Sequence, residues 1–316
     1  MTFSTTTATS GHLIRSQLWS TQLKEVFEDD LMALKYVDFL TGFPDGDQFN
    51  IASLGQMQVN DYAEGQAVKY SGFDSGQFTF TITEYKSIAT HITKKMLQDS
   101  FLASQITGQF VPKMRRALDK VMETDILALG PEAQTSGNLN QINGADHRWI
   151  GSGTNETIGI DDFARASYAL RKAEVPMNNL VAIVDPSVAY ALETSTNLVN
   201  VSNNPKWEGI IRDGMTTGMQ FRMNVYGWDV YISNNLKSGV NETIDGKTSA
   251  AGVANLFFSA DSSALPFVGA VRQSPVVESE YNKDYQREEY VMTTRYGLKL
   301  YRPENMVVVI TDTDQV

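Results

Sequence analysis

The sequence predicts an α+β fold, in which a long helix and a long β-hairpin flank a region of alternating strands and helices. Residues 97–129 carry apolar side chains every three or four positions, as one face of a helix does. Residues 77–83 alternate apolar and polar side chains, as a half-buried strand does. From residue 160 onward, short apolar runs alternate with helical patterns and turn residues.

Composition excludes several classes of protein. The chain has 316 residues, a net charge of -11 and no cysteine. Without cysteine there are no disulfides, thiolate metal sites or cysteine nucleophiles, which fits a reducing compartment. No apolar run approaches the ~18 residues needed to span a bilayer, so we expect neither membrane insertion nor export. The acidic balance argues against a protein that coats DNA by charge neutralisation, but not against one that encloses DNA.

The first 44 residues predict an arm followed by a helix. Residues 1–10 are mostly Thr, Ser and Ala, which indicates a flexible arm. Residues 16–34 repeat apolar side chains at helical spacing, which indicates an amphipathic helix that packs one face into a core. Gly42 and the turn at residues 43–46 end this region.

Residues 45–92 predict an extended hairpin. Its strands are expected at residues 49–54 and 77–83, with polar, turn-forming segments at 61–65 and 71–76 between them. A two-stranded ribbon is at best marginally stable alone, and this one has too few apolar residues for a core. We therefore expect another surface to hold it.

The helix at residues 97–129 would be about 50 Å long at 1.5 Å per residue. Pro112 cannot donate to the carbonyl of Gly108, so a bend is expected there rather than a break. Gly130 and Pro131 are expected to end the helix.

An α/β pattern follows. A helix is predicted at residues 160–173, opened by Asp161 and Asp162 at the positive end of its dipole. A strand at 180–184 leads into a helix at 186–192, with Asp185 as its cap. Further strands are predicted at residues 220–225, 228–233, 255–260, 267–271, 276–281, 289–300 and 306–311.

No catalytic, cofactor or metal-binding residues are predicted. His12, His91 and His147 fall in different regions, and polar neighbours indicate that they are surface side chains. Asp146 beside His147 could orient a general base, but no nucleophile is paired with it. No Walker loop, nucleophile elbow or dinucleotide fingerprint is present. A hydrolase on the α/β region is the least favoured alternative.

The sequence also contains two clusters of charged side chains, one on the long helix and one at residues 278–289. Lys113, Arg115, Arg116 and Lys120 lie on the long helix, as a solvated face or as a surface for acidic residues of a neighbouring chain or for packaged nucleic acid. Residues 278–289 mix both signs, which suits a protected strand edge or an intersubunit charge network. Its charged members are Glu278, Glu280, Lys283, Asp284, Arg287, Glu288 and Glu289.

The order of these segments resembles the major capsid proteins of tailed bacteriophages with the Hong Kong 97-type fold. The resemblance is most specific over residues 85–130, where Ile88-Ala89, Leu97-x-Asp99-Ser100 and Asp125-Ile126-Leu127 are similar to the junction between that family's extended loop and its spine helix. NLVAIVDP at 179–186 and YGWDVYIS at 226–233 resemble strands of its axial domain. RYGLKL at 295–300 is similar to closing strands of its peripheral domain.

The resemblance implies a Hong Kong 97-like capsid fold with discontinuous domains. These are an N-terminal arm and first helix (1–44), an extended loop (45–92), a peripheral domain with a long bent spine helix (93–150), an α/β axial domain (151–275) and returning peripheral strands (276–316). The extended loop would lie across a neighbouring subunit. The candidate intersubunit residues are Tyr62, Glu64, Lys69, Tyr70, Lys113, Arg115, Arg116, Glu278, Glu280 and Arg287.

The implied function is a structural shell protein of the virion, without enzymatic activity or cofactor. It would assemble in the bacterial cytoplasm into hexamers and pentamers of an icosahedral shell, enclosing double-stranded DNA without sequence-specific binding. Because only a short arm precedes Trp19, a separate scaffolding protein is expected, besides a portal and a decoration protein. An encapsulin-like compartment, which shares the fold but encloses enzyme cargo, is the main alternative. Lys69 and Asn282 are the candidates for a covalent crosslink between subunits.

Overall fold

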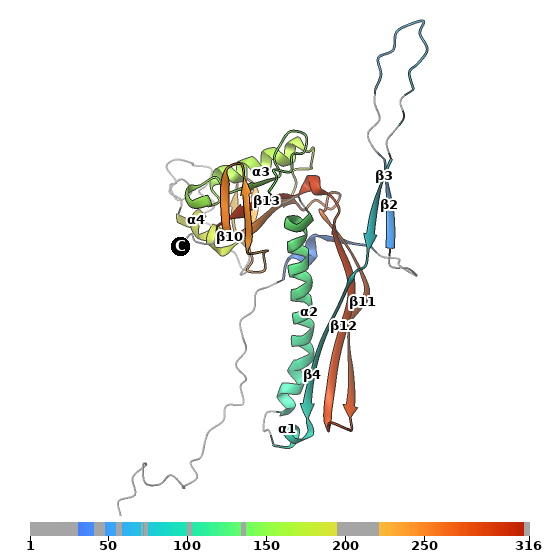
Figure 1. Cartoon of the computed structure of the whole chain (residues 1–316), viewed down its shortest axis with the longest axis vertical. Helices are drawn as coiled ribbons and strands as arrows, with labels where there is room; N and C mark the ends of the chain where they lie inside the picture. The colour runs from blue at the N-terminus through green and yellow to red at the C-terminus, as the bar shows by residue number, and fades with distance from the viewer. Residues whose placement is uncertain are drawn as a thin grey trace, which may run out of the picture.

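The chain folds into three parts: a body built on a seven-stranded sheet, an elongated part in which a long helix lies along a four-stranded sheet, and a projecting hairpin (Figure 1). This computed structural model describes residues 31–40, 48–54, 59–70, 72, 75–99, 103–133, 137–194 and 221–312. The mixture of helices and largely antiparallel sheets is the α+β class that the sequence predicts. Within these ranges no helix is long and apolar enough to cross a membrane.

The seven-stranded sheet is assembled from distant parts of the chain. Its order is β5 (Arg148–Ile150), β13 (Val307–Thr311), β10 (Lys247–Ser259), β6 (Leu180–Val184), β8 (Trp228–Ile232) and β7 (Phe221–Val225), with β9 (Val240–Ile244) beside β10. The C-terminal strand β13 therefore hydrogen bonds inside the body, between β5 and β10.

Both faces of this sheet are covered. Along β6, Ala182 and Val184 pack with helices α3 (Ile160–Lys172) and α4 (Pro186–Thr194), whereas Val181 and Ile183 pack with the C-terminal half of α2 (Ala103–Ala133). A strand buried on both faces needs apolar residues at every position, and β6 has them.

The predicted helix at 160–173, strand at 180–184 and helix at 186–192 are confirmed within two residues. Asp185 caps α4, because its Oδ2 accepts the backbone N–H of Ser187 at 2.9 Å. At the start of α3, Asp162 Oδ2 accepts the backbone N–H groups of Gly159 at 2.9 Å and Ser152 at 3.0 Å. Local signals were sufficient for these elements, since each cap acts within its own loop.

The four-stranded sheet has the order β1 (Val37–Phe39), β11 (Phe267–Asn282), β12 (Arg287–Leu300) and β4 (Glu84–Thr93). The first half of α2 packs on one face of it through Met114 and Leu118, which meet Met292 of β12. A short helix α1 (Lys94–Asp99) connects β4 to α2. The same helix thus supports both sheets, and this makes it the spine of the molecule (Figure 1).

The long helix differs from its prediction at its C-terminal end. It passes Pro112 without interruption, and it continues through Gly130 and Pro131 to Ala133. Gly130 does not end the helix; a Cβ there would lie 3.1 Å from Leu256 Cδ2, so glycine lets the helix approach β10 closely. At its start, α1 and α2 replace one helix from residue 97.

Other predicted boundaries also needed tertiary information. Most of the helix predicted at 16–34 lies outside the described residues, but Ala33–Tyr36 form a 3-10 helix (η1) and then continue into β1, which pairs with β11. The strands predicted at 267–271 and 276–281 are one strand, β11, with two register shifts between Val271 and Val276. Strands β5 and β9 were not predicted; short 3-10 helices η2 (Thr154–Glu156) and η5 (Pro303–Asn305) complete the fold.

The predicted hairpin is confirmed. Strand β2 (Gln48–Leu54) pairs antiparallel with β3 (Ser75–Thr81) over seven positions. Phe80 and Ile82 are buried against Val268 and Ala270 of β11, so the alternating face faces the chain's own sheet. Beyond that base, the hairpin extends away from the rest of the molecule (Figure 1).

Candidate functional site

The part of the hairpin farthest from the body, which we call the hairpin tip (59–70), is exposed throughout. Tyr62 is 66% exposed and Tyr70 is 97% exposed, and the predicted contact residues Glu64 and Lys69 are also on the surface. Asn60 Nδ2 donates to the backbone oxygen of Lys69 at 3.3 Å and so links the two sides of the tip. Side chains of this size are usually buried, so their exposure here indicates a surface for another molecule.

The base of the hairpin, in contrast, is firmly attached. Lys299 Nζ donates to the backbone oxygen of Thr79 at 2.8 Å and lies 4.8 Å from the centre of the Phe78 ring. The same ring makes an edge contact with Tyr301, with centroids 5.0 Å apart. The body therefore sets the direction in which the tip projects, while nothing in the described part of the chain covers the tip itself.

The predicted basic group on α2 lies on the outward side of that helix. Met114 and Leu118 face inward and are buried, whereas Lys113 and Arg115 are exposed and Arg116 is partly exposed. Arg115 Nε is 3.9 Å from Asp119 Oδ2, a weak surface pair one turn along the helix. We refer to Lys113, Arg115, Arg116 and Lys120 as the basic face of α2; it can receive carboxylates or aromatic rings.

The mixed charges at residues 278–289 surround the turn between β11 and β12. Arg287 Nε donates to Glu289 Oε1 at 2.6 Å, and this bond lowers the pKa of the Glu289 carboxyl. The Arg287 guanidinium also lies 4.7 Å from the centre of the Tyr285 ring. Glu278 and Glu280 are exposed on β11. Arg287 is thus occupied within its own chain, and the two glutamates remain on the surface.

Asn282, the crosslink candidate, is part of the same turn. Its Oδ1 accepts the backbone N–H of Asp284 at 3.1 Å, and its Nδ2 donates to Glu289 Oε1 at 3.2 Å. In Figure 1 this turn and the hairpin tip, which carries Lys69, lie at opposite ends of the molecule. Within one subunit the two side chains do not meet.

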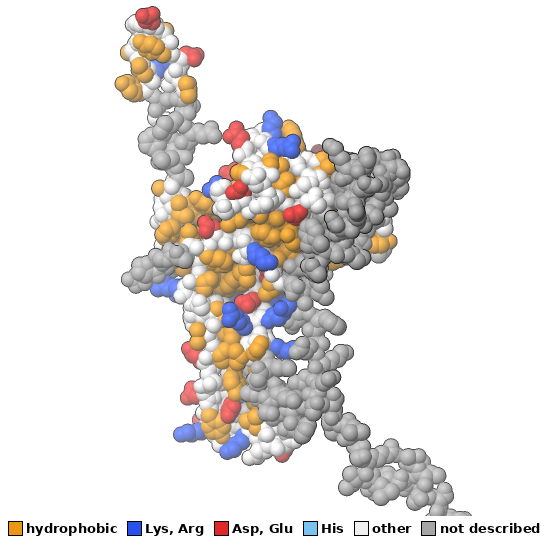
Figure 2. All heavy atoms as spheres, turned by 180° about the vertical axis from the view of Figure 1, so that it is seen from behind, with side chains coloured by type: hydrophobic (Ala, Val, Ile, Leu, Met, Phe, Trp, Pro, Cys, Tyr) orange, Lys and Arg blue, Asp and Glu red, His pale blue; other side chains and the backbone are white. Residues whose placement is uncertain are grey.

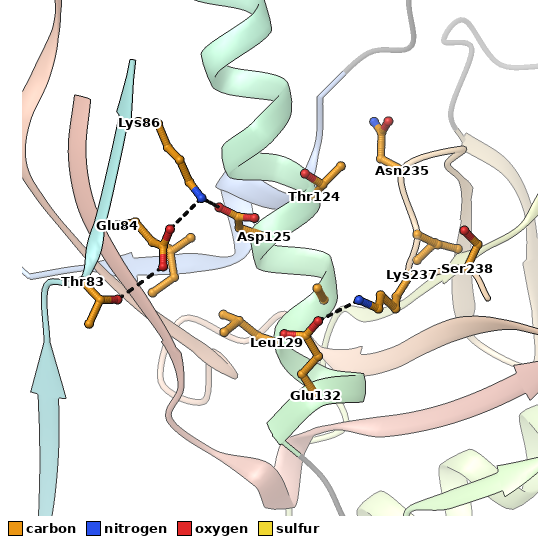
Figure 3. A pocket seen from close by; sticks show the side chains of 13 residues that line it. Thr83, Glu84, Lys86, Thr124, Asp125, Leu129, Glu132, Asn235, Lys237 and Ser238 are labelled. Atoms are coloured by element: carbon orange, nitrogen blue, oxygen red, sulfur yellow. Dashed lines mark hydrogen bonds and ion pairs between the residues drawn. The ribbon is translucent and has the colours of Figure 1, made fainter. Parts of the chain in front are cut away.

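A cavity of about 520 Å³ lies where the start of β4, the C-terminal half of α2 and the loop after β8 meet (Figure 3). Lys86 Nζ is 2.6 Å from Glu84 Oε2 and 3.9 Å from Asp125 Oδ2. The hydroxyl of Tyr296 donates to the same Asp125 oxygen at 2.6 Å, and burial raises the pKa of Tyr296. On the opposite wall Lys237 Nζ is 2.9 Å from Glu132 Oε1.

These pairs connect elements and offer no reactive group. Glu84, Lys86, Asp125 and Tyr296 join β4, α2 and β12, while Glu132 and Lys237 join α2 to the body. Each lining charge has a partner of opposite sign, and no nucleophile is paired with a base. We therefore interpret the cavity as a joint between the elongated part and the body. No local sequence pattern indicates this cavity, because its lining residues lie far apart along the chain.

Two further joints were missed by the sequence analysis. The carboxylate of Glu123, which is fully buried on α2, accepts the backbone N–H groups of Met32 at 3.0 Å and Ala33 at 2.8 Å. Arg148, 1% exposed, donates to both carboxylate oxygens of Glu242 at 3.0 and 2.5 Å and to the backbone oxygen of Pro131 at 3.2 Å. The first joint holds the N-terminal segment on the helix; the second holds the end of the helix on the body.

The histidines are not brought together. His147 is fully buried, so the prediction that it is a surface side chain is wrong; burial lowers the pKa of its imidazole. His91 is exposed on β4, and His12 lies outside the described residues. In the described ranges no group of three or more His, Cys, Asp or Glu side chains is placed to hold a metal ion.

The hydrophobic surface is not restricted to the tip. Figure 2 shows hydrophobic side chains gathered across the middle of the rear face, near the level of the hairpin base, with charged side chains scattered below them. Contiguous apolar surface of this kind is typical of a protein that associates with other chains.

The comparisons with known proteins agree with this surface. Residues 77–309 match the model of a family described as phage capsid protein. A structure from Mycobacterium phage Che8 matches with 21% identity over 93% of this chain and 96% of that chain, at a TM-score of 0.67. The mature capsid of bacteriophage PhiM1 matches with 12% identity over 95% of this chain and 93% of that chain, at a TM-score of 0.71. The capsid of Ralstonia phage GP4 matches with 12% identity over 98% of each chain, at a TM-score of 0.64.

No protein of curated function matches the sequence. The structural matches nevertheless span nearly the whole chain on both sides, so the Hong Kong 97-type capsid fold that the resemblance implied is confirmed. The identities are too low to transfer any residue's role from those structures to this one.

Proposed function

Because this chain belongs to the phage capsid protein family, and is therefore a structural protein of the virion rather than an enzyme, we propose that it is the major subunit of an icosahedral shell built from hexamers and pentamers. Solved structures that share its fold include a bacteriophage capsid and the capsid of a GTA particle, which are assembled shells. The family match is to phage capsid proteins, which favours a phage shell over an encapsulin-like compartment.

The observation that carries the proposal is the hairpin, which has a fixed base and an exposed tip. In an isolated subunit, the two tyrosines and several aliphatic side chains at the tip stay in water and contribute no free energy of burial to stability. In a shell, a neighbouring subunit supplies the missing surface. Obligate interfaces of that kind bury about 2,000 to 5,000 Å².

The basic face of α2 on a neighbouring subunit is the surface we assign to the tip. The tip presents Asp61 and Glu64 beside exposed Tyr62 and Tyr70, and these groups complement arginine and lysine by charge and by cation–π contact. Glu278 and Glu280 would form a second contact near the β11–β12 turn, which Arg287 holds in shape.

The charge of the chain supports a container for double-stranded DNA. A protein that coats DNA needs an excess of Lys and Arg on one face, and this chain carries a net charge of -11. An acidic wall repels packaged DNA from non-specific binding, so sequence-specific contacts are not needed. A tailed phage fills such a shell from outside.

The proposed domain division follows the implied one, with two adjustments. The arm and the spine helix keep their places, the extended loop would end before β4 (Glu84–Thr93) instead of at residue 92, and the axial domain is centred on residues 151–275. Strands β5 and β13 support an extension of the axial domain, because both pair within its sheet. The peripheral domain would then combine α1, α2 and β4 with the ribbon β11–β12.

The partners beyond self-association are proposals from the same reasoning. A separate scaffolding protein would guide assembly, a portal would occupy one vertex, and a decoration protein could bind the outer surface. By itself, the family match supports self-association in a capsid and none of these other partners.

The test is assembly of a hairpin variant. Deletion of residues 56–75 should leave a folded, soluble chain that forms no stable shells when it is expressed with the phage's scaffolding protein and viewed by electron microscopy. Tyr62→Ala combined with Tyr70→Ala should lower the yield of shells while the melting temperature of the unassembled subunit stays unchanged, because both side chains are exposed. Intact shells from the deletion variant would refute the role of the tip, and a wild-type chain that never forms shells would refute the function.

A further inference from the structure

The cavity of about 520 Å³ at the joint contains a hydrogen-bond donor that finds no acceptor in the described part of the chain. Asn235 lines the cavity from the loop after β8 and is 7% exposed. Its backbone N–H donates to Ser233 Oγ at 3.2 Å, but its side-chain Nδ2 has no partner. In Figure 3 this nitrogen lies on the side of Thr124 of α2. Because native proteins rarely leave a buried donor unpaired, the nitrogen indicates that another group binds there.

The wall opposite Asn235 offers an open acceptor. Asp125 Oδ2 accepts the hydroxyl of Tyr296 at 2.6 Å and lies 3.9 Å from Lys86 Nζ, which is too long for a hydrogen bond. Lys86 Nζ is instead 2.6 Å from Glu84 Oε2. The Asp125 side chain is 35% exposed, so its carboxylate can accept a further donor.

The charges of the lining select the sign of the ligand. Three carboxylates, those of Glu84, Asp125 and Glu132, line the cavity together with the two ammonium groups of Lys86 and Lys237. The lining is therefore negative by one charge. It repels an anion and favours a ligand with a single positive charge.

We propose that this cavity binds a lysine or arginine residue in an extended segment of a separate polypeptide. The backbone carbonyl of that residue accepts from Asn235 Nδ2, and its cationic group meets Asp125. Its aliphatic stem packs on the leucines of the lining, Leu129, Leu236 and Leu298. A polyamine has the charge but no carbonyl for Asn235. The cavity volume falls within the range of about 300–1,000 Å³ that is usual for ligand sites.

The lysines of a neighbouring copy fit this site less well. Lys69 shares the hairpin tip with Asp61 and Glu64, and the acidic lining repels both carboxylates. Lys94 and Lys95 belong to helix α1, so they are not in an extended segment. A separate polypeptide would contact the elongated part and the loop after β8 together. Its binding would therefore favour one arrangement of the elongated part relative to the body.

Capped single residues test the ligand class on the full, unassembled chain by NMR titration. N-acetyl-lysine methylamide carries the carbonyl, the stem and the ammonium group. The norleucine analogue lacks only the ammonium group, and the glutamate analogue carries a negative charge. For a ligand of about 14 non-hydrogen atoms we expect a dissociation constant of about 1 mM for the lysine probe. Both analogues should bind at least about fivefold more weakly.

Two substitutions separate binding from folding. Asn235→Leu removes the donor at similar volume and should weaken binding of the lysine probe about fivefold, the effect of one hydrogen bond. The melting temperature should not fall, because the amide that is lost is buried and unpaired. Asp125→Asn should reduce the preference for the lysine probe over the norleucine probe. Glu174→Gln, an exposed carboxyl outside the cavity, is the matched control and should change neither affinity.

Equal affinity for the lysine and glutamate probes, binding that Asn235→Leu does not weaken, or no saturable binding up to about 20 mM would overturn the site and leave the shell function intact. The source is tested with a photo-crosslinking amino acid at Ser238, in particles assembled together with the other proteins of the phage. A product with a second polypeptide, reduced by Asn235→Leu, is the expected result. No product, or a product between two copies of this chain, would overturn the assignment to a separate polypeptide.

Discussion

The buried ion pair between Arg148 and Glu242 gives the largest single effect that we expect on subunit stability. Arg148 is 1% exposed and Glu242 is 10% exposed at its side chain, so neither charge is well hydrated. Glu242→Gln keeps the shape of the side chain but leaves the guanidinium without its counter-charge. Breaking a buried pair from one side costs about 3–5 kcal/mol, and the partial exposure of Glu242 favours the lower end.

That cost converts to a measurable shift. At about 2.1 cal/mol/K per residue, the unfolding entropy of this chain is roughly 660 cal/mol/K, so about 3 kcal/mol lowers the melting temperature by about 5 °C. The assay is thermal unfolding of the unassembled subunit, followed by tryptophan fluorescence, to which the buried Trp149 next to Arg148 contributes.

The matched control is an exposed pair at the same junction. Lys237 and Glu132 are 45% and 59% exposed, so Lys237→Met should cost about 0–1 kcal/mol, less than about 2 °C. The double variant Arg148→Met with Glu242→Leu removes both charges and should recover most of the stability lost in Glu242→Gln. Equal shifts for Glu242→Gln and Lys237→Met would refute the reasoning.

Three further predictions concern other buried polar groups. Tyr296→Phe removes the hydrogen bond to the partly exposed Asp125 and should lower the free energy of unfolding by about 1–2 kcal/mol in urea titrations. Glu123→Ala leaves two buried backbone N–H groups without their acceptor and should cost at least about 2 kcal/mol by the same assay; a smaller loss would show that the N-terminal segment is held elsewhere. Burial lowers the pKa of His147, so below about pH 6.5 the unfolded chain takes up a proton that the folded chain does not. Stability should therefore fall as pH drops from about 6.5 toward the folded pKa, by up to about 1.4 kcal/mol per pH unit, and His147→Gln should reduce that slope.

Elements with strong local signals were predicted well from the sequence. Strand β6 is a continuous apolar run, α4 begins directly after a capping aspartate, and β3 alternates strictly. Each signal is contained within about ten residues, so no knowledge of the rest of the chain is needed. The order of such elements was sufficient to indicate the fold.

Elements that depend on distant partners were missed or divided. Strands β1 and β5 have three residues each and exist because β11 and β13 lie beside them. Strand β11 looked like two strands because Ser274 and Pro275 break its pattern, and two register shifts absorb that break. The end of α2 was misplaced because Gly130 serves close packing against Leu256 rather than helix termination.

The candidate functional residues divide in the same way, into those with a local sequence signal and those that depend on distant partners. The exposure of Tyr62 and Tyr70 was expected, since a hairpin with too few apolar residues for a core cannot bury its own tip. The joints at Glu123 and Arg148 were not, because their partners lie about 90 residues away in sequence. A signal did exist for Glu123: it interrupts the buried helical face that includes Met122 and Ile126, where an acidic residue needs a buried partner.

The most direct test of the shell function is electron microscopy of particles assembled from the full chain with its scaffolding protein, at a resolution that separates subunits. We expect closed shells with five- and six-subunit capsomers, in which each hairpin tip (59–70) covers the basic face of α2 on a neighbouring subunit. Shells in which the tip folds back on its own subunit or contacts no protein would contradict the account.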